Sequence, residues 1–270
     1  MKKMRGIFPG IFTFGNLFCG FLSILSSLDG NAVHAAWLVL LAGFFDALDG
    51  WIARFSRSTS RFGIELDSLA DFLSFGIAPA VLFYSFKLYA LGKWGFILGF
   101  VFIVCGAYRL ARHNLNAKAE KSHFYTGLPI PMSACTIAGY ALFCYHLWGE
   151  LRFPEILISM IIAFSGLMVS SISYDTLPSF NLGNKKNNLK LLYVFIGLIA
   201  ILLKPSLAFF PLGIIYVLSG AGREIYLMLH NPKKEEGWDF SFNIFQSLPS
   251  SQLIGINNEL LMKCLLNNFK

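Results

Sequence analysis

The sequence has few charged residues. Asp, Glu, Lys and Arg together make up 14% of the 270 residues, whereas soluble proteins have about 25%. Hydrophobic residues make up 56% of the chain, more than a single soluble domain of this length needs for its core. The composition therefore argues against a soluble protein and indicates an integral membrane protein with several spans.

Cysteine motifs, low-complexity segments and internal repeats are also missing from the sequence. The five cysteines show no CxxC or CxxH spacing, so neither a zinc site nor a redox-active pair of thiols is indicated. Four of the five fall inside apolar stretches, where a cysteine behaves as a small apolar residue. Apolar helices are thus the main feature of the chain.

Stretches of about 20 apolar residues are long enough to cross a bilayer as helices. We therefore expect an all-α integral membrane protein with about eight transmembrane helices. A membrane-embedded domain is expected over residues 1–230, followed by a polar cytoplasmic tail over residues 231–270. The eight stretches lie near Ile7–Leu28, Val33–Ala53, Asp67–Phe86, Trp94–Tyr108, Pro129–Trp148, Ile156–Ile172, Leu189–Leu203 and Leu207–Ala221.

Basic residues are distributed unevenly over the predicted loops. If the N-terminus is cytoplasmic and eight helices alternate, sixteen of the lysines and arginines up to Lys234 fall on the cytoplasmic side and four on the other, namely Lys87, Lys93, Arg152 and Lys204. Positive residues collect on the cytoplasmic side of membrane proteins. We therefore expect the inner (cytoplasmic) membrane, with both termini cytoplasmic. The net charge of +7 then needs no nucleic acid, because basic loops face anionic headgroups.

Acidic residues are scarce, yet one segment concentrates them. Five of the fifteen occur within 26 consecutive positions, namely Asp46, Asp49, Glu65, Asp67 and Asp71. An unpaired carboxylate inside a membrane helix costs several kcal/mol, so a cluster of this kind indicates a functional site. The site would lie near the cytoplasmic face.

Helical periodicity arranges four of these aspartates in two pairs. Asp46 and Asp49 share one helix face, and Asp67 and Asp71 share a face of the next helix. Antiparallel neighbours would bring all four carboxylates to a similar depth. Hard oxygen ligands at this density suit one or two Mg²⁺ or Mn²⁺ ions, which would bind a diphosphate. Alternatively, one or two of these acids cap a helix or lie at the membrane surface, as Asp67 could.

Small and basic residues follow the first acidic pair. Gly50 and Ala53 fall on the same helix face as Asp46 and Asp49, where small residues allow two membrane helices to approach closely. Arg54 comes directly after this face and would add a guanidinium to a bound anion.

The spacing of these residues resembles the complete signature of the CDP-alcohol phosphatidyltransferase family. The matching positions read Asp46-x2-Asp49-Gly50-x2-Ala53-Arg54-x8-Gly63-x3-Asp67-x3-Asp71. The resemblance implies a membrane-embedded enzyme, usually dimeric, with a six-helix catalytic bundle. Such enzymes transfer a phosphatidyl or related group from a CDP-linked lipid to an alcohol and release CMP.

The resemblance also implies residue roles. Asp46, Asp49 and Asp67 would be metal ligands, and Asp71 a ligand or the general base. The remaining signature residues, Gly50, Ala53, Arg54 and Gly63, would line the CDP site. The family usually has Pro-Asn where this chain has Pro9-Gly10; the contact of that Asn with CDP would then pass to Thr13, Asn16 or the Gly10 backbone.

Four further segments resemble the membrane-integral phosphatidylserine synthases of bacteria, a branch of this family. They are Phe8–Ile24, Tyr108–Asn114, Gly127–Ala134 and Leu167–Tyr174. The likeness implies CDP-diacylglycerol and L-serine as substrates and a homodimer in the bilayer. A sister enzyme for glycerol 3-phosphate, inositol phosphate or choline is one alternative. Another class is a divalent-cation or proton-coupled transporter, and a third is a membrane scaffold.

Two arginines, Arg109 and Arg112, end the fourth predicted span. Their guanidiniums suit a substrate carboxylate or a lipid phosphate, but they could equally anchor the cytoplasmic end of the helix. His113 and His123 are alternative bases, which the four nearby aspartates make less favoured.

Overall fold

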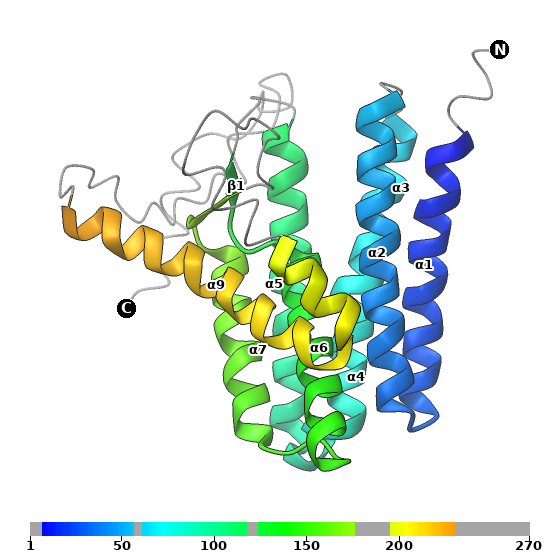
Figure 1. The fold of residues 1–270 in the computed structure, drawn as a ribbon, viewed down its shortest axis with the longest axis vertical. Coiled ribbons are helices and arrows are strands. Elements are labelled where there is room, and N and C mark those ends of the chain that lie inside the picture. Colours follow the sequence, from blue (N-terminus) through cyan, green and yellow to red (C-terminus); the bar gives the residue numbers. More distant parts are fainter. Residues whose placement is uncertain (1–6, 57–60, 118–123, 176–194, 231–270) are drawn as a thin grey trace, which may run out of the picture. The chain divides into compact units, whose positions relative to one another are not determined.

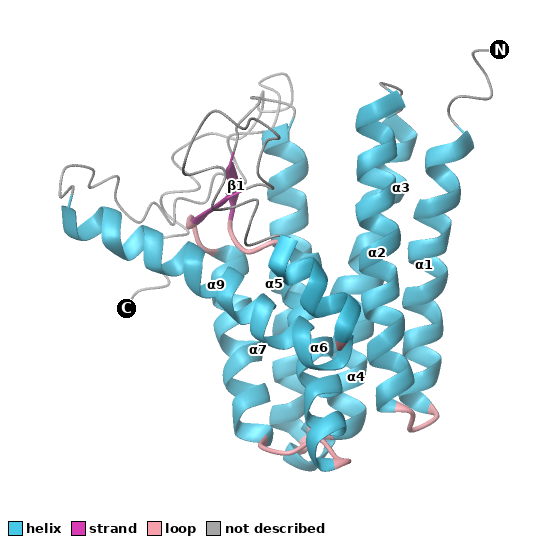
Figure 2. Cartoon of the chain, viewed as in Figure 1, coloured by secondary structure: helices cyan, strands magenta, loops and turns pink. Residues whose placement is uncertain are grey.

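The computed structural model describes residues 7–56, 61–117, 124–175 and 195–230 of the chain. Nearly all of these residues are helical (Figures 1 and 2), and residues 195–203 form a helix of their own. The other elements are α1 (Ile7–Leu28), α2 (Ala32–Ser56), α3 (Arg61–Asp71), the π-helical turn η2 (Phe72–Ile77), α4 (Ala78–Phe86), the 3₁₀ turn η3 (Leu88–Leu91), α5 (Lys93–Ala117), β1 (Phe124–Thr126), α6 (Ile130–Trp148), α7 (Pro154–Val169), β2 (Ser173–Asp175) and α9 (Pro205–His230).

Six helical segments of the described chain are long and apolar enough to cross a membrane. They are Gly10–Leu28, Ala32–Ile52, Phe62–Phe86, Lys93–Leu115, Ile130–Trp148 and Pro205–Glu224. The all-α integral membrane fold is thereby confirmed, whereas the count of eight spans is not. Helix α7 has 16 residues, fewer than the roughly 20 that cross a bilayer. The predicted span Leu189–Leu203 lies partly outside the described residues.

The chain divides into two compact units, Met1–Tyr226 and Leu227–Lys270. The described part of the second unit is the end of α9, and the predicted tail over residues 231–270 lies outside the described residues. The boundary at residue 230 and the cytoplasmic location of the tail therefore stay predictions.

Helix α1 is polar on its inner face and apolar on its outer face. Its exposed large residues recur every three or four positions, at Phe14, Phe18, Phe21 and Leu25. Its buried face has the same period and includes Thr13, Asn16, Gly20, Ser23 and Ser27, together with Cys19 and Ser26. Lipid can solvate the outer side chains, but the polar inner ones need partners within the protein, because an unpaired buried polar group is costly.

Small residues bring α1 and α2 close to their neighbours. The two helices run side by side (Figure 1), and α2 also packs on α6. A Cβ added at Gly20 would lie 2.3 Å from Ser74 Oγ, and one at Gly43 would lie 2.9 Å from Cys135 Sγ. The four described cysteines are free thiols and are half or fully buried, as expected for small apolar residues.

The third span changes its helical pitch directly after Asp71. Helix α3 ends at Asp71, η2 adds one π-helical turn, and α4 continues to Phe86. Within this turn Ser74 is fully buried, and its hydroxyl donates to the backbone carbonyl of Asn16 at 2.9 Å. π-Helical turns occur frequently at functional sites.

Within the described residues, two three-residue strands are the exception to the helical fold. β1 and β2 pair antiparallel, with Tyr125 opposite Tyr174. Tyr174 is fully buried and stacks on Tyr216 of α9, with ring centroids 5.7 Å apart. Burial raises the pKa of Tyr174 to about 12, so the phenol stays neutral and fastens β2 to α9.

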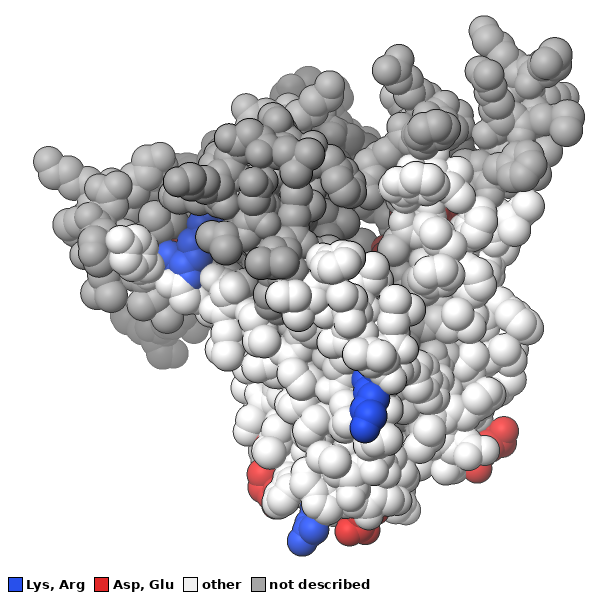
Figure 3. All heavy atoms as spheres, in the orientation of Figure 1, with Lys and Arg blue, Asp and Glu red and all other residues white. Residues whose placement is uncertain are grey.

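Charged side chains are sparse on the surface. On the face in Figure 3, uncharged side chains cover most of the described surface; most of the visible acidic surface lies near its lower end, and a little is visible further up. Large apolar side chains are correspondingly exposed on several helices, as Trp94, Phe96 and Phe100 are on α5. Such a surface fits contact with lipid.

Candidate active site

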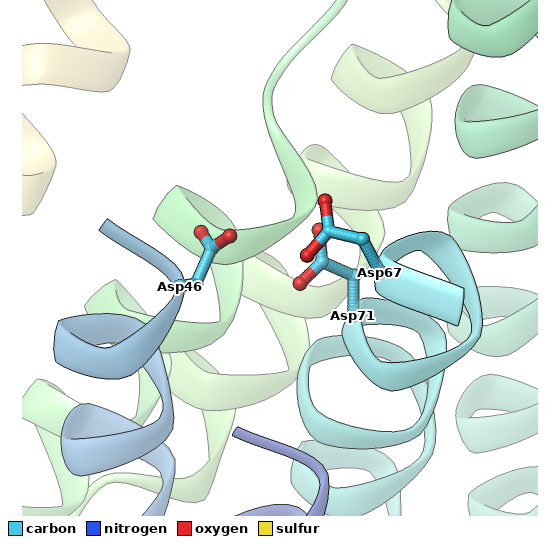
Figure 4. A group of neighbouring side chains, drawn as sticks. All are labelled: Asp46, Asp67 and Asp71. Atoms are coloured by element: carbon cyan, nitrogen blue, oxygen red, sulfur yellow. The ribbon is translucent and has the colours of Figure 1, made fainter. Parts of the chain in front are cut away.

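Three of the predicted aspartates lie together. Asp46 comes from α2, and Asp67 and Asp71 come from α3 (Figure 4). Each offers a carboxylate oxygen within 4.8 Å of the other two, and all three side chains are half-buried. The structure therefore brings these acids to one place from two helices, as their helical phasing predicts.

Asp49 lies one turn further along α2 and is not in the group of three. Its side chain is 6% exposed, and Oδ2 accepts a hydrogen bond from the hydroxyl of Thr13 on α1. Asp49 is thus bound by a residue of α1, although it lies only three positions from Asp46 in the sequence. Its predicted role as a metal ligand stays a prediction.

Asp71 also has a partner on α1. The side-chain amide of Asn16 donates from Nδ2 to Asp71 Oδ1 at 2.9 Å. Thr13 and Asn16 were predicted on the CDP side of the site, whereas here their side chains bind one carboxylate of each acidic pair. The period of α1 shows that Thr13 and Asn16 share a face with Gly20, Ser23 and Ser27, but it does not show that this face meets the aspartates.

The predicted packing role of Gly50 is wrong. A Cβ added there would meet nothing within 4 Å, and the residue is exposed. The open space beside it suits a ligand better than a helix contact. Close helix contacts occur instead at Gly20 and Gly43. Gly63 is in the first turn of α3.

Ala53 and Arg54 are in the last turn of α2, and their side chains lie outside the described part of the structure. Their predicted contacts with CDP stay predictions, as does that of Gly63. His123 likewise lies outside the described residues.

The two predicted arginines of α5 have different surroundings. Arg109 is 5% exposed, and its guanidinium is close enough to Asp71 for the two charges to interact. Arg112 binds the end of α7, donating from Nη1 to the carbonyl of Val169 at 3.0 Å and from Nη2 to that of Ser170 at 2.7 Å. Basic side chains at a helix C-terminus stabilise its unpaired carbonyl groups, so Arg112 has a structural role.

A further contact between α3 and α5 was not predicted from the sequence. Asn114 donates from Nδ2 to the hydroxyl of Ser68 at 2.9 Å. Ser68 directly follows Asp67, so this bond joins the basic end of α5 to the acidic helix. Asn114 ends one of the segments that resemble phosphatidylserine synthases, but no periodic pattern in the sequence pairs it with Ser68.

An integral membrane protein with three carboxylates grouped on facing helices is the class that the fold and site define. The family model for CDP-alcohol phosphatidyltransferase matches residues 6–172. The chain therefore belongs to the CDP-alcohol phosphatidyltransferase family, as its signature residues indicate.

Several curated proteins are similar to the chain. CDP-diacylglycerol–serine O-phosphatidyltransferase of Helicobacter pylori (strain 26695) is 35% identical over 229 residues, which cover 83% of this chain and 93% of that protein. The protein of the same name in Bacillus subtilis is 36% identical, covering 62% of this chain and 88% of its own length. Archaetidylserine synthase of Methanothermobacter thermautotrophicus is 41% identical, covering 62% and 68% respectively.

Proposed function

We propose that the chain is a phosphatidylserine synthase, which transfers the phosphatidyl group of CDP-diacylglycerol to the hydroxyl of L-serine and releases CMP. The observation that carries this proposal is the likeness to the Helicobacter pylori protein of that activity, which extends over 93% of its length. The archaeal relative also has serine in the name of its product. The choice of serine rests on these relatives.

The reaction balances without an oxidant or a further substrate. The serine hydroxyl oxygen forms a bond to the phosphorus that carries diacylglycerol. The bond between this phosphorus and the oxygen that bridges it to CMP breaks, and CMP leaves with that oxygen. The hydroxyl proton passes to a base, for which Asp71 is the proposed residue. The net balance is the same for direct displacement and for a route through an enzyme intermediate.

The donor set fits a hard divalent cation. Asp46, Asp67 and Asp71 offer carboxylate oxygens within 4.8 Å of one another, and oxygen ligands of this kind are those that Mg²⁺ and Mn²⁺ prefer. We propose that these residues hold one or two such ions, with Asp49 as the fourth member of the set. A bound ion supplies positive charge that stabilises the diphosphate and the departing CMP.

The protein side chains would orient the substrates around this group. The open space at Gly50 leaves room for the CDP moiety beside α2. Arg54 would bind a phosphate oxygen, and Arg109 would hold its charge near Asp71 and the incoming serine. Helices α2 and α3 would thus present the acids, and α2 and α5 one arginine each, to a diphosphate between them.

Orientation and assembly are part of the proposal. We propose a homodimer in the inner membrane, with the termini and the active site on the cytoplasmic side. Support comes from the sixteen basic residues against four on the two predicted sides. Reporter fusions test the orientation: a cytoplasmic reporter should be active at residue 1 and inactive in the loop at Asp29. The reverse pattern would contradict it.

An assay of CMP release tests the function. The purified protein in detergent is supplied with CDP-diacylglycerol, Mn²⁺ and either L-serine or glycerol 3-phosphate. We expect CMP to appear only with serine. Release with glycerol 3-phosphate instead would make the chain a sister enzyme, and no release with any alcohol would contradict transferase activity.

A further inference from the structure

The inner face of α1 has two kinds of polar contact. In the C-terminal part of α1, Ser23 donates to the backbone carbonyl of Ala35 at 2.9 Å, and Ser27 donates to that of Ser23 at 2.8 Å. These bonds only satisfy polar groups within the helix packing. Nearer the acids, Thr13 and Asn16 instead donate to the carboxylates of Asp49 and Asp71. The same face therefore changes from structural contacts to contacts with candidate catalytic groups.

Asn16 is fixed against the helix that carries Asp71. It is fully buried, and its backbone carbonyl accepts the hydrogen bond of Ser74, three residues beyond Asp71. One turn along α1, a Cβ at Gly20 would lie 2.8 Å from Ser74 Cα, so the two backbones are in contact. Asn16 and Asp71 thus belong to one tightly packed unit, held together by this close contact and by the Ser74 hydrogen bond.

The carboxylate determines how the Asn16 amide is turned. Nδ2 has two donor hydrogens and faces Asp71 Oδ1 at 2.9 Å. With the amide reversed, its oxygen would face a carboxylate oxygen, and two acceptors would repel each other. In return, the bond restricts rotation of the carboxylate and takes one lone pair of Oδ1, so that both lone pairs of Oδ2 stay available for a proton or a cation.

We propose that Asn16 is a positioning residue for Asp71 in phosphatidyl transfer. Its amide holds the carboxylate in the orientation that receives the alcohol proton, and the Ser74 contact in the π-helical turn holds the amide. The inference rests on the proposed function, because it assigns Asn16 to the reaction through Asp71. It differs from the predicted contact of Asn16 with CDP, which stays a prediction.

Two variants and a matched control test this role. Asn16→Leu has a similar volume but no donor, and Asn16→Ser keeps a donor on a smaller side chain. Ser23→Ala removes another fully buried hydrogen bond from the same face of α1, away from the acids. Initial rates of serine-dependent CMP release are measured over ranges of CDP-diacylglycerol and serine at saturating Mn²⁺. The shift in melting temperature produced by CDP-diacylglycerol with Mn²⁺ is measured in parallel.

We expect Asn16→Leu to lower kcat about 10- to 100-fold, the usual effect of losing a partner that orients a catalytic group, with little change in either KM. Asn16→Ser should recover part of kcat, and Ser23→Ala should leave kcat unchanged. Both Asn16 variants should keep the lipid-induced shift in melting temperature. A wild-type kcat in Asn16→Leu, a loss confined to the KM for CDP-diacylglycerol, or an equal loss in Ser23→Ala would each overturn the role.

The same assays separate this inference from the proposed function. If the wild-type protein releases CMP with serine while Asn16→Leu does so at the same kcat, only the positioning role fails. If the wild-type protein uses another alcohol, the choice of serine fails and the variants are compared with that alcohol. A wild-type protein that releases no CMP with any alcohol contradicts both.

Discussion

The guanidinium of Arg112 lies 2.7 Å from the carbonyl oxygen of Ser170, measured from Nη2. Gly127 lies against both groups. Its φ is +79°, and a Cβ there would be 2.8 Å from Arg112 Nη2 and 3.2 Å from the Ser170 carbonyl oxygen. Three segments that resemble phosphatidylserine synthases thus meet at one point, although they are far apart in the sequence. The contact between these three segments gives their residues a role in packing.

Replacing Arg112 should reduce stability more than substrate binding. Arg112→Lys keeps the charge but cannot donate two hydrogen bonds in the same geometry, and each lost bond from a charged group costs about 1.5–3 kcal/mol. We expect a lower melting temperature with an unchanged KM for serine. Arg152→Lys, at an exposed position, is the matched control. A raised KM for serine at an unchanged melting temperature would instead assign Arg112 to the substrate.

The contact between α1 and η2 predicts an asymmetry between two glycines. Gly20→Ala would place a methyl group 2.3 Å from Ser74 Oγ, whereas Gly166→Ala, exposed on α7, would meet nothing within 4 Å. Overpacking a tight contact costs about 1–3 kcal/mol. Thermal unfolding in detergent should show a lower melting temperature for Gly20→Ala alone. Equal melting temperatures for the two variants would show that α1 and η2 are not tightly packed.

The base assignment predicts a loss of chemistry without a loss of folding. Asp71→Asn is isosteric and can still accept the Asn16 hydrogen bond through its amide oxygen, but it cannot take up the alcohol proton. We expect CMP release to fall by about 10²–10⁴-fold, while CDP-diacylglycerol still raises the melting temperature. The control is Asp29→Asn, in the exposed turn after α1. Retained turnover in Asp71→Asn would remove Asp71 as the base.

The ligand assignment predicts a changed metal requirement. Removing one carboxylate of the group in Asp46→Asn should raise the Mn²⁺ concentration for half-maximal activity by more than about tenfold. Titrating Mn²⁺ into protein that has been treated with chelator measures this shift. The wild-type protein should be inactive before Mn²⁺ is added. An unchanged half-maximal concentration in the variant would show that Asp46 is not a ligand.

The sequence predicts the acidic group well because helical geometry is regular. An aspartate pair three or four residues apart must share a face, so Asp67 and Asp71 could be paired before their helix was seen. Asp46 could be placed opposite them because the connection between the two helices is short. The membrane fold follows with the same certainty, since apolar stretches of sufficient length have few other stable forms.

The contacts of Asn16 could not be predicted in the same way. Its partner is 55 positions away, and periodicity reveals which residues share a face but not what that face meets. The surroundings of Gly50 could not be predicted from its position either. A small residue on a helix face is compatible with a close helix contact and with an open site, and Gly50 borders open space. The predicted span Ile156–Ile172 differs from α7 (Pro154–Val169) by two or three residues at each end, because sequence patterns locate the ends of a helix less well than its middle.

Oxygen labelling of serine tests the central claim most directly. The protein is incubated with CDP-diacylglycerol, Mn²⁺ and L-serine carrying ¹⁸O in its hydroxyl group, and the lipid product and CMP are analysed by mass spectrometry. Attack of the serine hydroxyl on phosphorus predicts phosphatidylserine that retains the ¹⁸O in its phosphate ester, with one unlabelled CMP for each lipid formed. Phosphatidylserine without the label, or CMP release without any phosphatidylserine, would contradict the proposed transfer.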